Sequence, residues 1–150
     1  TPLNLYNKPV NQFVAGFIGS PAMNFIDVTV NNENKLSSKN GQLIFSLSAE
    51  QTNLLKDHKN ENISMGVRPE DIQLEKNSNN SIEIEALTEV MEPMGNETFI
   101  YFEVEKIQFI ARVKPSKELK RGEKIKLYVD SANVYFFEKQ SGKNIFQSVY

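Results

Sequence analysis

Short segments of alternating apolar and polar residues, each ended by a turn signal, limit most strongly how this chain can fold. The clearest is Ser81–Leu87, where apolar and acidic residues alternate as along a strand with one buried and one solvent-facing side. Asn40-Gly41 and Gln140–Lys143 are typical of tight turns. Segments this short and this regularly interrupted predict a barrel or sandwich. We therefore expect a mainly β chain with two or three short helices.

The expected strands occupy most of the chain after residue 23. They are Phe25–Val30, Gln42–Leu47, Ile63–Val67, Ser81–Leu87, Thr98–Glu105, Gln108–Val113, Lys124–Val129 and Val134–Phe137. A first helix is expected over Pro9–Ile18, which has apolar residues at helical spacing after an N-terminal proline. Ser48 and Gln51 form a capping-box pattern that opens a second helix, to about His58. The polar stretch Asn31–Asn40 is expected to be a loop.

Composition excludes several classes of protein. The chain has 150 residues, of which 39% are hydrophobic and 24% charged, as in an ordinary soluble globular protein. Its net charge of −2 and its pI near 5.5 do not indicate the basic face of a nucleic-acid binder. No apolar stretch approaches the roughly 20 residues that span a bilayer. The absence of cysteine excludes disulfides and thiolate metal ligands, and it fits a cytoplasmic location.

No residue pattern in the sequence indicates catalysis. Gly142-Lys143 is its single Gly-Lys pair, but Asn144 follows where a phosphate-binding loop needs Ser or Thr. Phe137 stands where the first glycine of such a loop would be. The one histidine, His58, lies in a polar segment and cannot supply a multi-histidine zinc site. We therefore predict no catalytic, cofactor or metal site in this chain.

Three motifs, in order along the chain, carry a resemblance to one protein family. The opening, Thr1–Pro9 followed by Phe13–Phe25, resembles the segment after the nucleotide-binding domain in MalK-like proteins. These are the ATPase subunits of maltose, multiple-sugar and glycerol-phosphate importers. Gly66–Glu70 resembles their Gly-(Ile/Val)-Arg-Pro-Glu motif, and Glu92–Thr98 resembles their Leu-Gly-Asn-Glu-Thr-type segment. The resemblance therefore extends over essentially the whole chain.

The resemblance implies both a fold and a role. It implies an OB-like β fold of the TOBE or MOP-like type over residues 20–150, as one barrel or as two intertwined barrels. Residues 1–19 would be the linker and helix after a nucleotide-binding domain, and the unusual Thr1-Pro2 start agrees with a longer parent chain. ATP and Mg²⁺ would bind in that other domain. The implied role is a non-catalytic regulatory and dimerisation domain of a bacterial importer ATPase, cytoplasmic and peripheral at the inner face of the membrane.

The implied partners are a second copy of the subunit, the importer's membrane subunits through the parent chain, and possibly a regulatory protein, but no nucleic acid. The candidate interface or regulatory residues are Arg68, Glu70, Gly95, Asn96 and Glu97. Each also has a structural explanation. Pro69 restricts Arg68 to extended backbone, and Arg68 could pair with a carboxylate to fix the chain. Gly95-Asn96 suits a tight turn, although loops on a rigid barrel commonly carry recognition.

Two other functions stay open on the sequence. An OB-like domain could sense an oxyanion or a metabolite, as related domains do for molybdate. It could also stack single-stranded bases on the aromatic residues grouped in two strands, Phe99, Tyr101, Phe102, Tyr135, Phe136 and Phe137. The acidic pI favours a core and interface role for these aromatic residues over base stacking.

Overall fold

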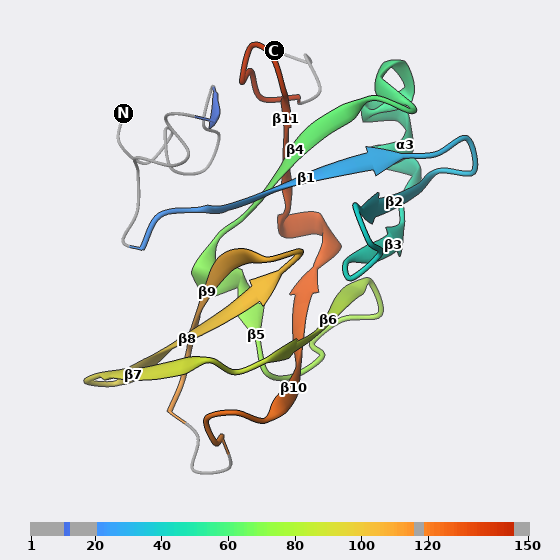
Figure 1. Ribbon diagram of the computed structural model, residues 1–150. Helices are drawn as coiled ribbons and strands as arrows, with labels where there is room; N and C mark the ends of the chain where they lie inside the picture. The colour runs from blue at the N-terminus through green and yellow to red at the C-terminus, as the bar shows by residue number, and fades with distance from the viewer. Residues whose placement is uncertain (1–10, 13–20, 116–118, 146–150) are drawn as a thin grey trace.

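The computed structural model describes residues 11–12, 21–115 and 119–145, whose strands form three antiparallel sheets (Figure 1). The first has the order β11-β4-β1-β2-β3, with bounds β1 (Asn24–Val30), β2 (Lys35–Ser38), β3 (Ile44–Ser46), β4 (Asn62–Val67) and β11 (Tyr135–Glu138). The second has the order β5-β10-β6, with bounds β5 (Ile72–Gln73), β6 (Ser81–Leu87) and β10 (Lys124–Asp130). The third has the order β7-β8-β9, with bounds β7 (Val90–Met94), β8 (Glu97–Val104) and β9 (Ile107–Val113). The predicted mainly β fold is confirmed.

The helices that lie wholly within the described residues are short. They are α3 (Ala49–Leu54) and the 3₁₀ turns η1 (Lys56–His58), η2 (Pro69–Asp71) and η3 (Ser131–Asn133). The predicted capping box is present, because Ser48 Oγ accepts from the Gln51 N–H at 3.1 Å and Gln51 Oε1 accepts from the Ser48 N–H at 3.1 Å. The single helix predicted from Ser48 to His58 is wrong in one respect: α3 ends at Leu54, and η1 follows as a separate 3₁₀ turn.

The other predicted helix, Pro9–Ile18, lies almost entirely outside the described residues. Within the described ranges, no helix is long and apolar enough to cross a membrane.

The prediction of a loop over Asn31–Asn40 is wrong, because β2 forms inside this stretch and pairs with both β1 and β3. Its Leu36 is fully buried opposite Val30. One apolar residue among polar neighbours is too short a pattern to reveal a strand, whereas burial of Leu36 against the sheet is enough to form one. The predicted strand Gln42–Leu47 is correspondingly shorter in the structure, where β3 covers Ile44–Ser46.

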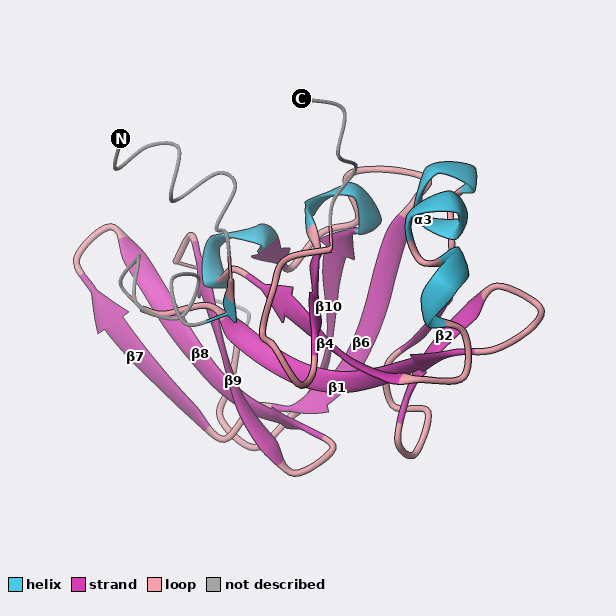
Figure 2. Ribbon diagram, turned by 90° about the horizontal axis from the view of Figure 1, so that it is seen from above, coloured by secondary structure: helices cyan, strands magenta, loops and turns pink. Residues whose placement is uncertain are grey.

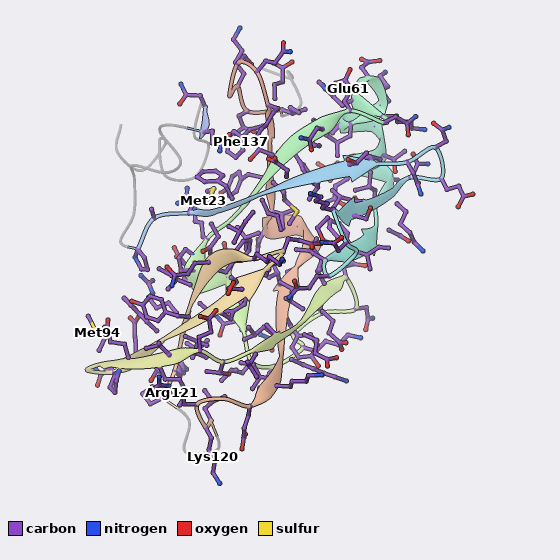
Figure 3. All side chains as sticks on the ribbon, viewed as in Figure 1. Met23, Glu61, Met94, Lys120, Arg121 and Phe137 are labelled. Carbon is purple, nitrogen blue, oxygen red and sulfur yellow. The ribbon has the colours of Figure 1, made fainter. Side chains whose placement is uncertain are left out.

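The last strand returns to the first sheet and forms its edge beside β4. β11 pairs with β4 in antiparallel register, with Tyr135 opposite Gly66. Gly66 faces Met23 and Phe137, whose side chains lie close together in Figure 3 and form a small buried cluster. A Cβ atom at Gly66 would stand 2.4 Å from Met23 Sδ and 3.0 Å from Phe137 Cε2. Glycine therefore allows this close approach at the β4–β11 pair, and a side chain at this position would require Met23 and Phe137 to shift.

A continuous hydrophobic core unites the three sheets, which lie around it in Figure 2. Its largest fully buried side chains include Leu36 of β2 and Leu43 just before β3 in the first sheet, Ile84 in the second sheet, and Phe102 and Phe109 in the third. The two phenylalanine rings are packed with 5.8 Å between their centroids. The sheets therefore hold their loops and hairpins as one rigid support.

Candidate functional site

The turn between β7 and β8 forms the outer end of a projecting hairpin. Met94 pairs with Glu97, which leaves Gly95 and Asn96 as a two-residue turn. Gly95 has φ +72°, which is the conformation that a type II′ hairpin turn requires of its first central residue. Both turn residues are exposed, and Figure 3 shows Met94 at the hairpin end, away from the body of the chain. The predicted tight turn is confirmed.

One face of this hairpin sheet combines exposed apolar side chains with an ion pair. Val90 and Met94 of β7 are 45% and 49% exposed. On the neighbouring strands, Glu97 Oε2 lies 2.9 Å from Arg112 Nε. The register places Phe99 opposite Arg112 on the same side of the sheet. The face therefore offers apolar contact area and both signs of charge, as the contact surface between two proteins commonly does.

Arg68 and Glu70 belong to a different part of the structure, at the end of β4 and in η2. Arg68 has extended backbone, with φ −75° and ψ 142°, as Pro69 requires. It is only 3% exposed, and its guanidinium carbon lies 5.4 Å from the centre of the Tyr135 ring. Glu70 is half-buried. The structure thus places Arg68 between elements, with little surface for a partner, and places Glu70 away from the hairpin turn.

The next residue, Asp71, has an unusual environment. Burial, the neighbouring Glu70 carboxylate and Asp130 raise the pKa of Asp71 to about 6, against a lowering effect of Arg68. Among the described residues, none donates a hydrogen bond to its carboxylate. The sequence offers no sign of this, because Asp71 reads there as an ordinary polar residue after a turn.

A hydrogen-bonded contact that the sequence does not predict joins the β2–β3 loop to the β8–β9 hairpin. The Glu105 carboxylate accepts from the N–H of Asn40 at 2.8 Å, from Asn40 Nδ2 at 2.9 Å, from the N–H of Gln42 at 3.3 Å, and from Ser38 Oγ. In return, Gln42 Oε1 accepts from the N–H of Glu105 at 2.7 Å. The Asn40-Gly41 turn is visible in the sequence, but its partner 65 residues later is not.

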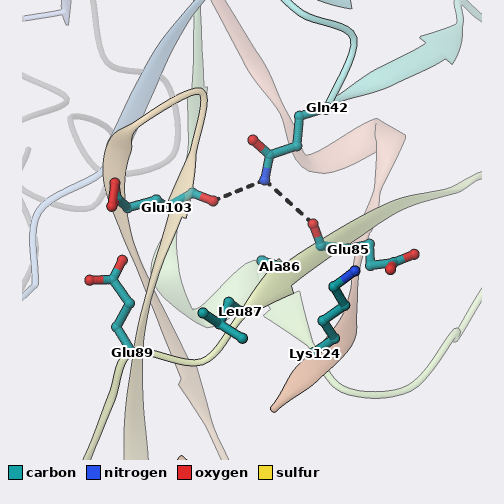
Figure 4. Close-up of a pocket in the computed structure, with 7 residues that line it drawn as sticks. All are labelled: Gln42, Glu85, Ala86, Leu87, Glu89, Glu103 and Lys124. Carbon is teal, nitrogen blue, oxygen red and sulfur yellow. Dashed lines mark hydrogen bonds between the residues drawn. The ribbon is translucent and has the colours of Figure 1, made fainter. Parts of the chain in front are cut away.

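Beside this contact lies a groove of about 600 Å³ (Figure 4). Gln42 Nε2 spans its upper side, donating to the carbonyl oxygens of Glu103 at 2.9 Å and Glu85 at 3.4 Å. The groove is lined by three glutamates and one lysine, and Leu87 is 51% exposed within it. An excess of carboxylates repels an oxyanion. In the part of the chain that the structure describes, no cluster of three or more His, Asp or Glu residues could hold a metal ion.

Comparisons with known proteins agree along most of the chain. Residues 19–72 match the MalK OB fold domain, and residues 65–137 match the TOBE domain. The multiple sugar-binding transport ATP-binding protein MsmK of Streptococcus mutans is 40% identical over 146 residues, covering 94% of this chain. The trehalose/maltose import ATP-binding protein MalK of Thermococcus litoralis is 29% identical over 154 residues, covering 97% of this chain.

This chain spans about two fifths of these relatives, 38% of MsmK and 40% of MalK. Among solved structures, the cytoplasmic molybdate-binding protein ModG resembles it with a TM-score of 0.56 at 13% identity, over 75% of this chain and 94% of that one. Identity this low supports a shared fold alone.

Proposed function

Because the chain belongs to the family of OB-fold and TOBE domains found in MalK-like ATP-binding subunits, we propose that it is the non-catalytic regulatory and dimerisation part of a bacterial sugar importer's ATPase. The observation that carries this proposal is the succession of the two domain matches over residues 19–137, with a 40% identical relative along nearly the whole chain. Neither matched domain is a nucleotide-binding domain. ATP and Mg²⁺ are therefore assigned to another part of the parent chain, which would be cytoplasmic and peripheral at the membrane.

The proposed partner surface is the outer face of the β7–β8 hairpin, with Gly95, Asn96 and Glu97 at its end. Exposed Val90 and Met94 supply apolar area there, and Glu97 and Arg112 supply opposite charges. In a two-fold contact the same patch serves both copies, so such a mixed face can be complementary to itself. Pairing of two copies through this face would hold two ATPase subunits together while their nucleotide sites open. The importer's membrane subunits would be reached through the parent chain, and a regulatory protein would bind this domain itself.

The alternative function is sensing of an oxyanion, and the similarity to ModG is one of fold alone and does not favour it. The groove of Figure 4 argues against it, because the described residues that line it include three carboxylates, Glu85, Glu89 and Glu103, and one cation, Lys124. We therefore place the regulatory and dimerisation role first.

Sedimentation velocity over a concentration series tests the proposal. We expect the 150-residue chain to pair weakly, because the parent's other contacts, which raise the effective concentration, are missing. Glu97→Lys should weaken pairing by about tenfold or more, since it places a like charge beside Arg112 twice in each dimer. Glu83→Lys, an exposed charge reversal on β6, is the matched control and should leave pairing unchanged.

A double variant separates the effect of Glu97→Lys on dimerisation from its effect on the stability of the folded chain. Glu97→Lys also breaks the pair with Arg112, which as an exposed ion pair contributes about 0–1 kcal/mol to folding. Glu97→Lys with Arg112→Glu restores opposite charges within each copy and between copies, so it should recover both stability and pairing. A chain that is monomeric at every concentration, or whose pairing is unaffected by Glu97→Lys, would contradict this assignment of the interface.

A further inference from the structure

A second groove, of about 550 Å³, lies on another edge of the molecule, between α3 and the segment that runs from η3 into β11. Figure 2 shows α3 next to β6, whose first residue pairs with the end of β10, where η3 begins. Gln51 and Leu54 of α3 form one wall, and residues 131–136 form the other. Asp71 and Asn80 reach the groove from η2 and from the loop before β6. Its volume falls within the range of small-molecule sites.

Hydrogen bonds fix the walls of this groove. Gln51 is buried, and while its Oε1 closes the capping box with Ser48, its Nε2 donates to the Ser131 carbonyl at 2.7 Å. The N–H of Ser131 in turn donates to the Asn80 carbonyl at 3.0 Å. Asp130 Oδ1 caps η3 by accepting from the N–H of Ala132 at 3.0 Å. A groove held in this way needs little rearrangement to receive a ligand, which lowers the entropic cost of binding.

Several polar groups along the groove have no hydrogen-bond partner among the described residues. They are the carboxylate of Asp71 and the side-chain amides of Asn80 and Asn133. The Asp71 carboxylate is half-buried, and burial is the largest cause that raises the pKa of Asp71. A partly desolvated carboxylate without a donor is costly to the folded state. A ligand that donates to it would remove that cost.

The lining also restricts the charge of the ligand. Among the described residues, it contains the carboxylates of Glu50 and Asp71 and no lysine, arginine or histidine. A side-chain amide carries both a hydrogen-bond donor and an acceptor, and so does each hydroxyl group of a sugar. The ring of Tyr135 adds an apolar surface, which the guanidinium of Arg68 packs against. This combination excludes anions and matches a neutral molecule with many hydroxyl groups.

We propose that the groove between α3 and η3 binds a neutral polyhydroxylated molecule, a sugar or a sugar alcohol. The Asp71 carboxylate accepts a hydrogen bond from one ligand hydroxyl, and the side-chain amides of Asn80 and Asn133 form hydrogen bonds with other hydroxyls. The site is distinct from the hairpin face of the proposed dimer. Its existence does not depend on that dimer.

The experiment is a titration of the ¹⁵N-labelled 150-residue chain, followed by backbone amide NMR shifts, with glucose, maltose and sorbitol as probes and spermidine and sulfate as charged competitors. We expect saturable shifts confined to amides of α3, η3 and the start of β11. Asp71→Ala and Asn133→Ala should each weaken binding by about tenfold, as expected for the loss of one hydrogen bond to the ligand. Asn53→Ala, exposed on α3 and outside the groove, should change the affinity by less than about twofold.

The outcomes separate clearly. If none of the three hydroxylated probes shifts these amides, or if the shifts map to another face, the proposal is wrong. Stronger binding of spermidine or sulfate in this groove would equally overturn the neutral ligand. Asn133 is exposed, so Asn133→Ala keeps the test decisive even if Asp71→Ala alters folding. The two surfaces are tested independently. If Glu97→Lys abolishes dimerisation and leaves the sugar-induced amide shifts unchanged, this inference stands.

Discussion

Replacing Glu105 with Gln should destabilise the fold by removing the charge at the contact between the β2–β3 loop and the β8–β9 hairpin. The carboxylate accepts four hydrogen bonds, from Ser38, from the backbone and side chain of Asn40, and from the backbone of Gln42. The amide of Gln would keep one acceptor oxygen and place an NH₂ group against the remaining donors. Leaving donors unsatisfied in this way costs more than losing the bond itself.

The magnitude follows from the number of charged hydrogen bonds and from their exposure. A hydrogen bond to a charged group contributes roughly 1.5–3 kcal/mol, but Glu105 is half-buried and the donors of Asn40 can turn to water. We therefore expect Glu105→Gln to lower the free energy of unfolding by about 1–2 kcal/mol at pH 7. For a chain of this size that corresponds to a loss of roughly 2–8 °C in melting temperature. Glu103→Gln, an exposed neighbour on the same hairpin, is the matched control.

The pH dependence provides a second measure. Burial raises the pKa of Glu105, but the hydrogen bonds from Ser38, Asn40 and Gln42 outweigh it, and the pKa is lowered from its ordinary value of 4.5. A carboxyl group whose folded pKa is lowered stabilises fully above its unfolded pKa, and this contribution is lost as the pH falls through the folded pKa. Urea unfolding should therefore show the difference between wild type and Glu105→Gln at pH 7, and a smaller difference below about pH 4.

Two results would refute this reasoning. The first is a melting temperature of Glu105→Gln equal to that of the wild type at pH 7. The second is a difference that stays constant down to pH 3, because the carboxylate would then contribute nothing as a charge. An equal loss in the Glu103→Gln control would show that net charge, rather than this contact, is responsible.

Three further predictions concern the β4–β11 pair, Asp71 and nucleotide. Gly66→Ala should destabilise the fold by about 1–3 kcal/mol, because the Cβ atom of the alanine would collide with Met23 and crowd Phe137. Denaturant titration measures this, and an unchanged unfolding midpoint would contradict the packing described. Asp71→Asn should stabilise the chain by about 1–2 kcal/mol at pH 7 and have little effect below pH 4. The pKa of Asp71 is raised from 3.8 to about 6 in the folded chain, so ionisation of this carboxyl group costs stability as the pH rises between these values. A loss of stability in Asp71→Asn at pH 7 would contradict this reasoning. The chain should bind no ATP in isothermal titration calorimetry, and saturable binding that chelation of Mg²⁺ abolishes would contradict the reading of Gly142-Lys143 as a turn.

Local chemistry allowed much of this fold to be predicted from the sequence. Alternation over Ser81–Leu87 appears in the structure as β6, whose apolar Ile82, Ile84 and Ala86 are buried while Glu83 and Glu85 are exposed. The capping box and the glycine turn at Gly95 also form as predicted. These features depend on residues close together in the chain, so a short window of sequence contains all the information needed.

The features that the sequence did not reveal depend on contacts between distant segments. β2 forms because Leu36 meets the core, and the position of Glu105 matters only because the fold brings it to Asn40. The groove at Asp71 is likewise assembled from five separate segments. The candidate residues illustrate the same difference, since Gly95 could be placed correctly as a turn, whereas the burial of Arg68 against Tyr135 required the return of β11.

That return also explains why the Gly66–Glu70 motif is better understood as a structural junction than as an exposed contact. The two domain matches overlap at residues 65–72, where β4 ends and η2 begins. β4 pairs on one side with β1 and on the other with β11, so its last residues belong to both domains at once. Gly66 admits the close approach of Phe137, and Arg68 packs on Tyr135 of the same strand. A change in this motif should therefore alter how the two matched domains fit together. It would reach the proposed partner surface on the β7–β8 hairpin through β9, against which η2 packs.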